Sequence, residues 1–399
     1  MELFRSRPFF ARLLAVPAVL SVALGLAQAQ DDVTAKPPDT PPILSIGSAA
    51  PDFNLPGVDG KNHSLKEYAG AKVLAIVFTC NHCPVAQMYE KRIKQLASDY
   101  RDKGVAVVAI NPNAPNAVHL SEMGYTDLGD SLAEMKIRAQ YRHFNFPYLS
   151  DGDNQKVALK YGPVATPHVF VFDKERKLRY EGRVDSNPRE ELATKHEARD
   201  AIDAVLAGKT VAVERAPAVG CSTKWAYKEA GTKAELANEA AEPVNVELAS
   251  AEQLKTIRKN AGTGKLLLVN FWATWCGPCV GEFPELQKMV RQFRARQINI
   301  VTLSVNAPDE KDMVLSFLKK EHAFNRNLLF NSNDAAEAAP AFNAGWTGAV
   351  PYTVLIGMNG ELLYHSQGAM DPIDVKRAIL KYLPDDHYKG QNAYWNSSF

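Results

Sequence analysis

The sequence predicts an α/β protein with two domains, each a central mixed β-sheet flanked by helices. The chain has 399 residues, which is enough for two domains that each bury a core of their own. A Cys-x-x-Cys motif occurs in each half, at Cys80–Cys83 and at Cys276–Cys279. Each motif follows an apolar, strand-like run and precedes a helix-like segment, and the pattern recurs after about 200 residues. This repeat distance favours two whole domains of one architecture over a solenoid.

Residues 1–29 have the pattern of a secretory signal peptide. Three arginines precede the apolar run 13–26, and small residues at 27–29 are suitable for cleavage. The apolar run contains Pro17 and is shorter than the roughly 20 residues that a membrane-spanning helix needs, so cleavage is favoured over an uncleaved anchor. We therefore expect an exported protein, in a periplasm-like compartment and soluble after cleavage. Residues 30–46, with four prolines among polar residues, are expected to form an extended linker.

The first predicted domain covers residues 47–207. Apolar periodicity predicts, in chain order, a hairpin over 53–65, a strand over 72–79, a helix over 83–103, a strand over 105–110, a helix over 131–141, strands over 169–172 and 178–181, and a helix over 189–206. Strand, dithiol, helix, strand, helix, hairpin and helix is the order of elements in the thioredoxin fold.

The second predicted domain covers residues 244–383 and repeats this order. Its expected elements are a strand over 266–271, a helix over 278–294, a strand over 298–305, a helix over 311–321, strands over 352–356 and 361–364, and a helix over 375–382. Residues 208–243 have little apolar periodicity and are expected to be a linker. Residues 384–399 form a tail that contains aromatic residues but no readable period.

Charge and cysteine usage exclude several classes of function. The formal net charge is +1 and the chain has no basic block, so no nucleic-acid partner is expected. Four of the five cysteines form the two motifs and Cys221 is the fifth, whereas a stabilising disulfide framework would spread its cysteines across long loops. The cysteines are therefore expected to carry out thiol chemistry, which needs no organic cofactor and no resident metal.

The second dithiol has the residues of a thiol-disulfide exchange site. A helix that begins beside Cys276 favours its thiolate, and Cys279 can then resolve a mixed disulfide. Residues 268–279 resemble the exported, TlpA-like branch of the thioredoxins, and the resemblance covers about residues 245–383. It implies a cis-proline pair at Val350–Pro351 that, with Trp275, binds a substrate strand. It also implies that Glu282 moves the proton of Cys279.

The first dithiol encloses His82, which is expected to stabilise the thiolate of Cys80. We expect Cys80 to attack and Cys83 to resolve, and the stabilised reduced form would make this pair more oxidising than the second. Residues 50–55, 72–84, 166–167 and 217–225 resemble the AhpC/TSA-type redoxins, which are peroxiredoxin-like proteins often named as antioxidants. The resemblance covers about residues 47–225 and implies a cis-proline pair, Thr166–Pro167, that contributes to substrate binding.

The resemblance has departures that bear on function. Peroxiredoxins place Pro-x-x-x-Thr-x-x-Cys around the attacking cysteine, and neither cysteine of the first motif has that context. Ala165 stands directly before Thr166, where many relatives have a cysteine. Cys221 is either a third redox thiol, able to resolve Cys80 or Cys83, or a small buried residue that holds the linker against the domain.

These observations predict an exported thiol-disulfide oxidoreductase. Its partners would be disulfide-bearing client proteins and a membrane-linked thiol reductant. One alternative is a thiol-dependent peroxidase in which the second domain recycles the first. Another is copper or zinc binding at the first dithiol, with His82 joined by His63, His143 or His168.

Overall fold

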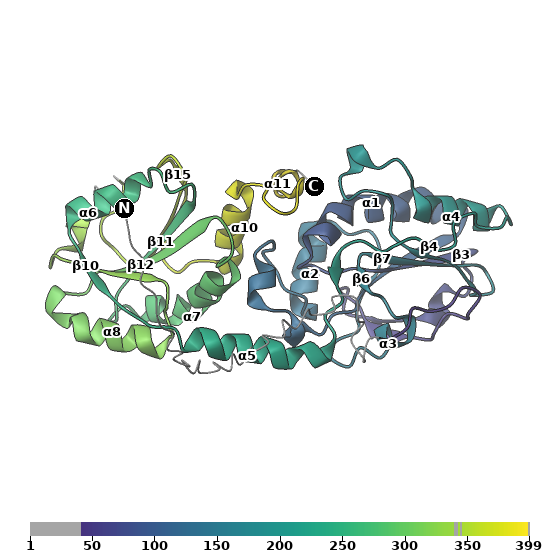
Figure 1. The fold of residues 1–399 in the computed structure, drawn as a ribbon, viewed down its shortest axis with the longest axis horizontal. Coiled ribbons are helices and arrows are strands. Elements are labelled where there is room, and N and C mark those ends of the chain that lie inside the picture. The colour runs from purple at the N-terminus through teal and green to yellow at the C-terminus, as the bar shows by residue number, and fades with distance from the viewer. Residues whose placement is uncertain (1–40, 339–341, 344, 398–399) are drawn as a thin grey trace, which may run out of the picture. The chain divides into compact units, whose positions relative to one another are not determined.

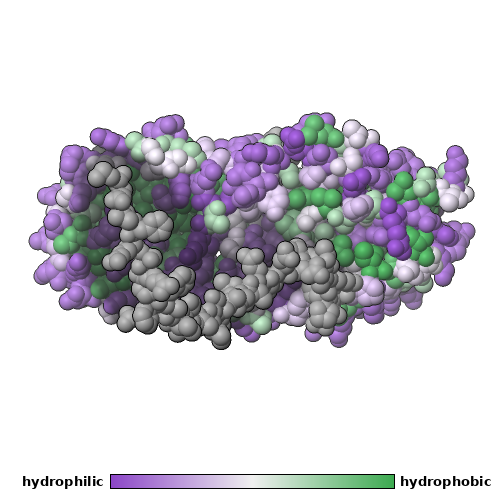
Figure 2. Space-filling model, in the orientation of Figure 1, coloured by the Kyte–Doolittle hydropathy of each residue, from purple (hydrophilic) through white to green (hydrophobic). Residues whose placement is uncertain are grey.

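The computed structural model describes residues 41–338, 342–343 and 345–397. The predicted signal peptide, 1–29, lies outside these residues. No helix in the described part of the chain combines the length and the apolar character that a membrane span requires. On the face seen in Figure 2, scattered apolar patches lie among hydrophilic side chains.

The first sheet has five strands in the order β5-β4-β3-β7-β8. Strands β3 (Val73–Phe78), β4 (Val105–Asn111) and β5 (Tyr148–Ser150) are parallel, and β7 (His168–Phe172) and β8 (Leu178–Gly182) run antiparallel. A short hairpin, β1 (Asn54–Pro56) with β2 (Asn62–Ser64), precedes them. The central strand β3 consists of apolar and mainly β-branched or aromatic residues, all buried, as a strand covered on both faces requires.

Helices cover both faces of this sheet. Helices α1 (Pro84–Tyr100) and α4 (Glu197–Leu206) lie on one face and α3 (Ala158–Tyr161) lies on the other (Figure 1). Alternate residues of β3 therefore enter different cores: Val73, Ala75 and Val77 pack with α1, whereas the intervening side chains pack with α3. Helix α2 (Leu132–Tyr141) begins at a capping box formed by Ser131 and Glu134.

The second sheet has six strands in the order β10-β13-β12-β11-β14-β15. Their bounds are β10 (Glu247–Ala249), β11 (Leu266–Trp272), β12 (Ile298–Ser304), β13 (Arg326–Phe330), β14 (Tyr352–Ile356) and β15 (Leu362–Gln367). The associated helices are α6 (Ala251–Lys259), α7 (Gly277–Gln292), α8 (Lys311–Lys320) and α10 (Pro372–Tyr382). The protein thus consists of two thioredoxin-like α/β domains, as the sequence predicted.

Most elements agree with the prediction, including the edge strands β8 and β15, but three strands were missed and one helix starts later than expected. Strands β5, β10 and β13 were not predicted, because they are short or carry polar residues at their ends. The predicted helix over 189–206 is helical as α4 only from Glu197, after a single 3₁₀ turn at Glu190–Leu192. Strands as short as β5 and β10 give too few residues for a period to be recognised.

Both predicted linkers contain packed structure. Ile43, Leu44 and Ile46 contact the first core, and the N–H of Leu44 donates to the carbonyl of Tyr161, so residues 41–46 are not an extended tether. The segment 208–243 contains a strand, β9 (Cys221–Ser222), and a helix, α5 (Glu229–Ala240). Since Trp225 is buried in the first core, that domain continues beyond residue 207.

The tail also has an ordered place. Helix α11 (Gln391–Asn396) packs against α1, where the Tyr394 hydroxyl donates to Glu90 (2.8 Å) and accepts from the Arg138 guanidinium. Gln391 donates to the side chain of Gln87 at 3.2 Å. Tyr394 of the tail thus contacts residues that are far away in the sequence, and such contacts leave no local period in the tail.

Candidate redox sites

The second dithiol lies at the N-terminus of α7. Cys276 is the N-cap residue, and its Sγ accepts from the N–H of Cys279 at 3.3 Å. The two cysteines form a disulfide with Cα atoms 5.3 Å apart. Cys276 is 5% exposed and Cys279 is fully buried, whereas the adjacent Trp275 side chain is 65% exposed. A partner would therefore reach Cys276 before Cys279, beside a large exposed aromatic surface.

Glu282 is a buried carboxyl group on the same helix as this dithiol. It follows Cys279 by three residues on α7, so both side chains are on one face of the helix. Asn270 donates to one carboxyl oxygen at 3.0 Å, and the N–H of Met370 donates to the other at 2.8 Å. Burial raises the pKa of Glu282, and these two hydrogen bonds oppose the rise only in part. A carboxyl group with a raised pKa is suited to exchange a proton near neutral pH.

Strand register shows which cysteines correspond between the two domains. Phe78 of β3 pairs with His168, the residue after Pro167, and Phe271 of β11 pairs with Tyr352, the residue after Pro351. Both peptide bonds before these prolines are cis, as the resemblances implied. Five residues after the equivalent phenylalanines stand Cys83 and Cys276. Cys83 is thus the counterpart of Cys276, and Cys80 is the counterpart of Ala273.

The surroundings of the first dithiol agree with that correspondence. Cys83 is the N-cap of α1, and its Sγ accepts from the N–H groups of Ala86 (3.4 Å) and Cys221 (3.2 Å). The Thr166 carbonyl, 3.2 Å away, accepts from the protonated thiol and opposes ionisation. Burial raises the pKa of Cys83, but hydrogen bonds from Cys221, Cys80 and Ala86, with the charge of His82, outweigh it and hold the pKa well below its usual value.

Cys80 has the opposite character. Burial is the largest cause of a pKa well above the ordinary value, and the hydrogen bond to Cys83 and the charge of Asp130 raise it further. The Thr166 hydroxyl lies 3.1 Å from Cys80 Sγ. The structure therefore does not support the expectation that His82 stabilises a Cys80 thiolate. The stabilised thiolate is that of Cys83, because this cysteine, not Cys80, begins the helix.

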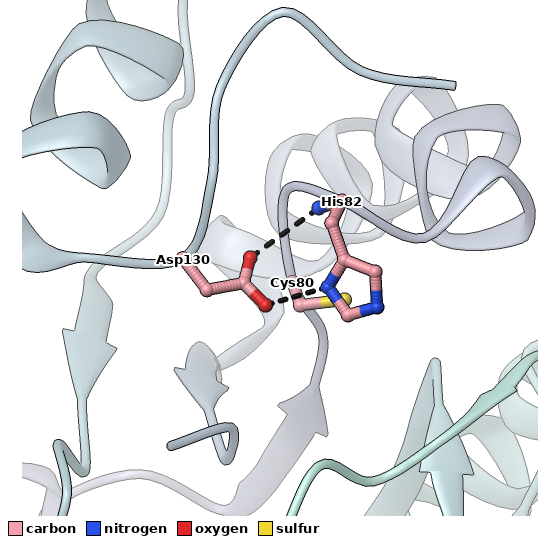
Figure 3. Close-up of side chains that lie close together, drawn as sticks. All are labelled: Cys80, His82 and Asp130. Atoms are coloured by element: carbon pink, nitrogen blue, oxygen red, sulfur yellow. Dashed lines mark hydrogen bonds and ion pairs between the residues drawn. The ribbon is translucent and has the colours of Figure 1, made fainter. Parts of the chain in front are cut away.

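His82 is held by a buried carboxylate from a distant loop. Its Nδ1 donates to Asp130 Oδ2 at 2.6 Å, and its N–H lies 3.3 Å from Oδ1 (Figure 3). Asn113 and the N–H of Asn81 also donate to Asp130, at 2.7 and 2.8 Å. Burial lowers the pKa of His82, but Asp130 raises it by more, and the resulting pKa is above the ordinary value. Asp130 was not predicted, since a single aspartate 48 residues from His82 has no local signal.

The histidines proposed as additional metal ligands lie elsewhere. His63 bonds to Asp59, His168 bonds to Glu181, and His143 is exposed. The group that the fold does assemble is Cys80, His82 and Asp130, whose ligand atoms all lie within 4.8 Å of one another. In this group His82 Nδ1 is already occupied by Asp130, whereas Nε2 is buried and has no hydrogen-bond partner among the described residues.

A cavity of about 270 Å³ lies beside the first dithiol. Its lining includes His82, Cys221 and Glu122 from the first domain, and His387 and Tyr388 from the tail. Burial and the neighbouring Cys221 raise the pKa of Tyr388. The predicted site residue Cys221 is thus brought to the first dithiol and not to the second.

Comparison with known proteins identifies the family. The model of the AhpC/TSA family matches residues 46–181 and 238–365, which together are more than half of the chain. A thiol-disulfide oxidoreductase, ResA, of Geobacillus kaustophilus is 28% identical over 121 residues, which are 30% of this chain and 65% of that protein. A thiol:disulfide interchange protein, CycY, of Rhizobium leguminosarum is 32% identical over 117 residues, 29% of this chain and 58% of that protein.

The chain therefore spans less than two thirds of these relatives. Among solved structures, a hypothetical protein, SMc02350, of Sinorhizobium meliloti is 34% identical, with 46% of this chain and 96% of that chain covered and a TM-score of 0.41. An uncharacterized protein of Geobacillus kaustophilus is 35% identical, with 46% and 93% covered and a TM-score of 0.41. Because the family model matches both halves of the sequence, the chain belongs to the AhpC/TSA family.

Proposed function

We propose that this chain is an exported thiol-disulfide oxidoreductase with two redox sites, of which the second acts on disulfide-bearing client proteins. The observation that carries the proposal is the Cys276–Cys279 disulfide at a helix N-terminus, beside an exposed Trp275. The names of the curated relatives, which are thiol-disulfide oxidoreductases or interchange proteins, support the reaction class. Export rests on the sequence pattern of residues 1–29.

At the second site, reduction of a client follows two exchange steps. The thiolate of reduced Cys276 attacks a client disulfide, forms a mixed disulfide and expels one client thiolate. Cys279 then loses its proton to Glu282 and attacks Cys276 Sγ, which releases the second client thiolate and forms Cys276–Cys279. The client would approach along Val350, directly before Pro351, where its backbone could add as a strand.

At the first site, we propose that Cys83 is the attacking thiolate. Stabilisation of this thiolate stabilises the reduced form, so its disulfide should be more oxidising than Cys276–Cys279. A membrane-linked reductant could then supply the second site, and electrons would pass from there to the first. A difference of about 30 mV would favour that transfer by only about 1.4 kcal/mol.

Redox titration of both dithiols tests this function. The full chain, Cys80→Ser/Cys83→Ser and Cys276→Ser/Cys279→Ser are equilibrated in glutathione or dithiothreitol buffers, and their thiols are quantified by alkylation and mass spectrometry. Two reversible couples are expected, with the first more oxidising. Insulin serves as a model protein disulfide, and its reduction should be lost in Cys276→Ser/Cys279→Ser and retained in the other variant. Retention of insulin reduction without Cys276 and Cys279 would refute the proposal.

Zinc binding at the first site is a second candidate, favoured by the grouping of Cys80, His82 and Asp130. It predicts one zinc ion per reduced protein, measured by equilibrium dialysis and metal analysis. Binding should be lost in Cys80→Ser and in Asp130→Asn and kept in Cys276→Ser/Cys279→Ser. Absence of binding by the reduced protein would remove this candidate.

A further inference from the structure

The first domain fills its own substrate-strand position. Strand β9 pairs antiparallel with β6 (Ala165–Thr166), so that Thr166 lies opposite Cys221. Strand β6 leads directly into Pro167, which is where an added client strand is expected to pair in this fold. In the second domain, no strand among the described residues pairs with Val350, the counterpart of Thr166. Strand β9 of the same chain therefore occupies the position beside Thr166 and Pro167 where a substrate strand was predicted to bind.

The pairing brings the sulfur of Cys221 to Cys83. The N–H of Cys221 donates to Cys83 Sγ at 3.2 Å, and the nearby Cys83, together with burial, raises the pKa of the Cys221 thiol. Gly220 allows the close approach, because a Cβ atom at this position would lie 1.8 Å from the carbonyl oxygen of Thr166. A cysteine held in this position by backbone pairing is placed as the cysteine of a bound client would be.

Exposure separates the three thiols of the first domain. Cys80 is 3% exposed and Cys83 is fully buried, whereas Cys221 is only partly buried and lines the cavity beside His82. An external thiol would therefore reach Cys221 before either cysteine of the motif.

We propose that Cys83 and Cys221 form the redox-active disulfide of the first domain, with residues 220–222 as a built-in substrate strand. This inference deepens the proposed function and rests on it. It makes Cys221 the partner of Cys83 in place of Cys80. The external co-reactant is a thiol or disulfide small enough to enter the cavity, such as glutathione.

The proposed reaction is a reversible thiol-disulfide exchange between the Cys83–Cys221 disulfide and two external thiols. In reduction, an external thiolate attacks Cys221 Sγ, forms a mixed disulfide there and expels Cys83 as a thiolate, which the helix N-terminus stabilises. A second external thiolate attacks the external sulfur, releases the small disulfide and leaves Cys221, which takes a proton from solvent. Two electrons pass from two external thiols to one protein disulfide. Oxidation by a small disulfide is the reverse.

Disulfide mapping tests the inference. The full chain is reduced, oxidised with glutathione disulfide, blocked with N-ethylmaleimide and digested with trypsin. We expect a linked pair of peptides, residues 73–91 and 216–224, in the wild type and in Cys80→Ser. The pair should be absent in Cys83→Ser and in Cys221→Ser. Gly220→Ala keeps every thiol but displaces β9, and it should slow formation of the link by about tenfold or more.

Each other result overturns the inference. A Cys80–Cys83 disulfide with Cys221 alkylated would make Cys221 a structural residue. An unchanged rate in Gly220→Ala would show that β9 does not position the sulfur. The disulfide within residues 266–288, which contain Cys276 and Cys279, is the internal standard. If it cycles while Cys83 and Cys221 do not, only this inference fails; if it does not cycle either, the proposed function fails as well.

Discussion

The buried pair of Asp130 and His82 makes a quantitative prediction for Asp130→Asn. Both side chains are almost fully buried, and Asp130 accepts hydrogen bonds from His82, Asn113 and the N–H of Asn81. The amide of asparagine carries no charge and can accept at only one of its two positions. Removal of one partner of a buried ion pair costs about 3–5 kcal/mol, because the other charge stays buried without compensation. Since the Oδ1 of asparagine can still accept one of these bonds, we expect a loss of about 3 kcal/mol.

The loss should depend on pH with a definite sign. Burial raises the pKa of Asp130, but His82 and the N–H donors lower it by more, so the folded pKa is below 3.8. The pKa of His82 is raised above 6.5. An acid whose pKa is lowered by folding stabilises the fold at pH values above its pKa in the unfolded chain. A histidine whose pKa is raised by folding stabilises the fold at pH values below its pKa in the unfolded chain. The difference in unfolding free energy between wild type and variant is therefore largest between pH 3.8 and 6.5. It declines as pH rises through the raised pKa of His82 or falls through that of Asp130.

Pulse alkylation in increasing urea measures this free energy for the first domain alone. Mass spectrometry follows labelling of the peptide 73–91, which contains Cys80 and Cys83. The exposed Asp153→Asn is the matched control and should change the unfolding free energy by less than about 0.5 kcal/mol. A loss below about 1 kcal/mol in Asp130→Asn, or a loss that is larger at about pH 9 than at about pH 5, would refute the reasoning.

Three further predictions follow from the contacts described above. Glu282→Gln should slow insulin reduction by about a hundredfold or more because its amide cannot take a proton, whereas Glu285→Gln, at a partly exposed position on the same helix, should not; stopped-flow rates of both variants check this. Tyr394→Phe leaves the buried guanidinium of Arg138 without one acceptor and should reduce the free energy of unfolding by about 1–3 kcal/mol in urea titrations; no change would contradict a tail docked on α1. Trp275→Ala should raise the KM for insulin with no loss of thermal stability, since its side chain is 65% exposed; an unchanged KM would exclude contact with the client.

The sequence alone determined the features that depend on neighbouring residues. The apolar run of β3 and that of β11, each followed by a dithiol and a helix, gave the two-domain α/β prediction, because strand and helix periods are local properties. The same local reasoning located Cys276 at a helix N-terminus and Glu282 one turn after Cys279. Strands β5, β10 and β13 and the docked segments were missed, because short or irregular elements are stabilised by contacts with distant parts of the chain.

Only the tertiary structure decided how the thiols are grouped. The motifs Cys80–Cys83 and Cys276–Cys279 have the same spacing, which suggests that their first cysteines correspond. Strand register and the start of α1 instead place Cys83, not Cys80, in the position of Cys276. Asp130 and Cys221 reach the first dithiol from 48 and 138 residues away. Their charge and hydrogen bonds determine which sulfur is ionised, and no pattern in the sequence reports them. The physical reason is that a thiol pKa depends on every group within a few ångströms, and the fold, not the spacing of residues along the chain, brings those groups together.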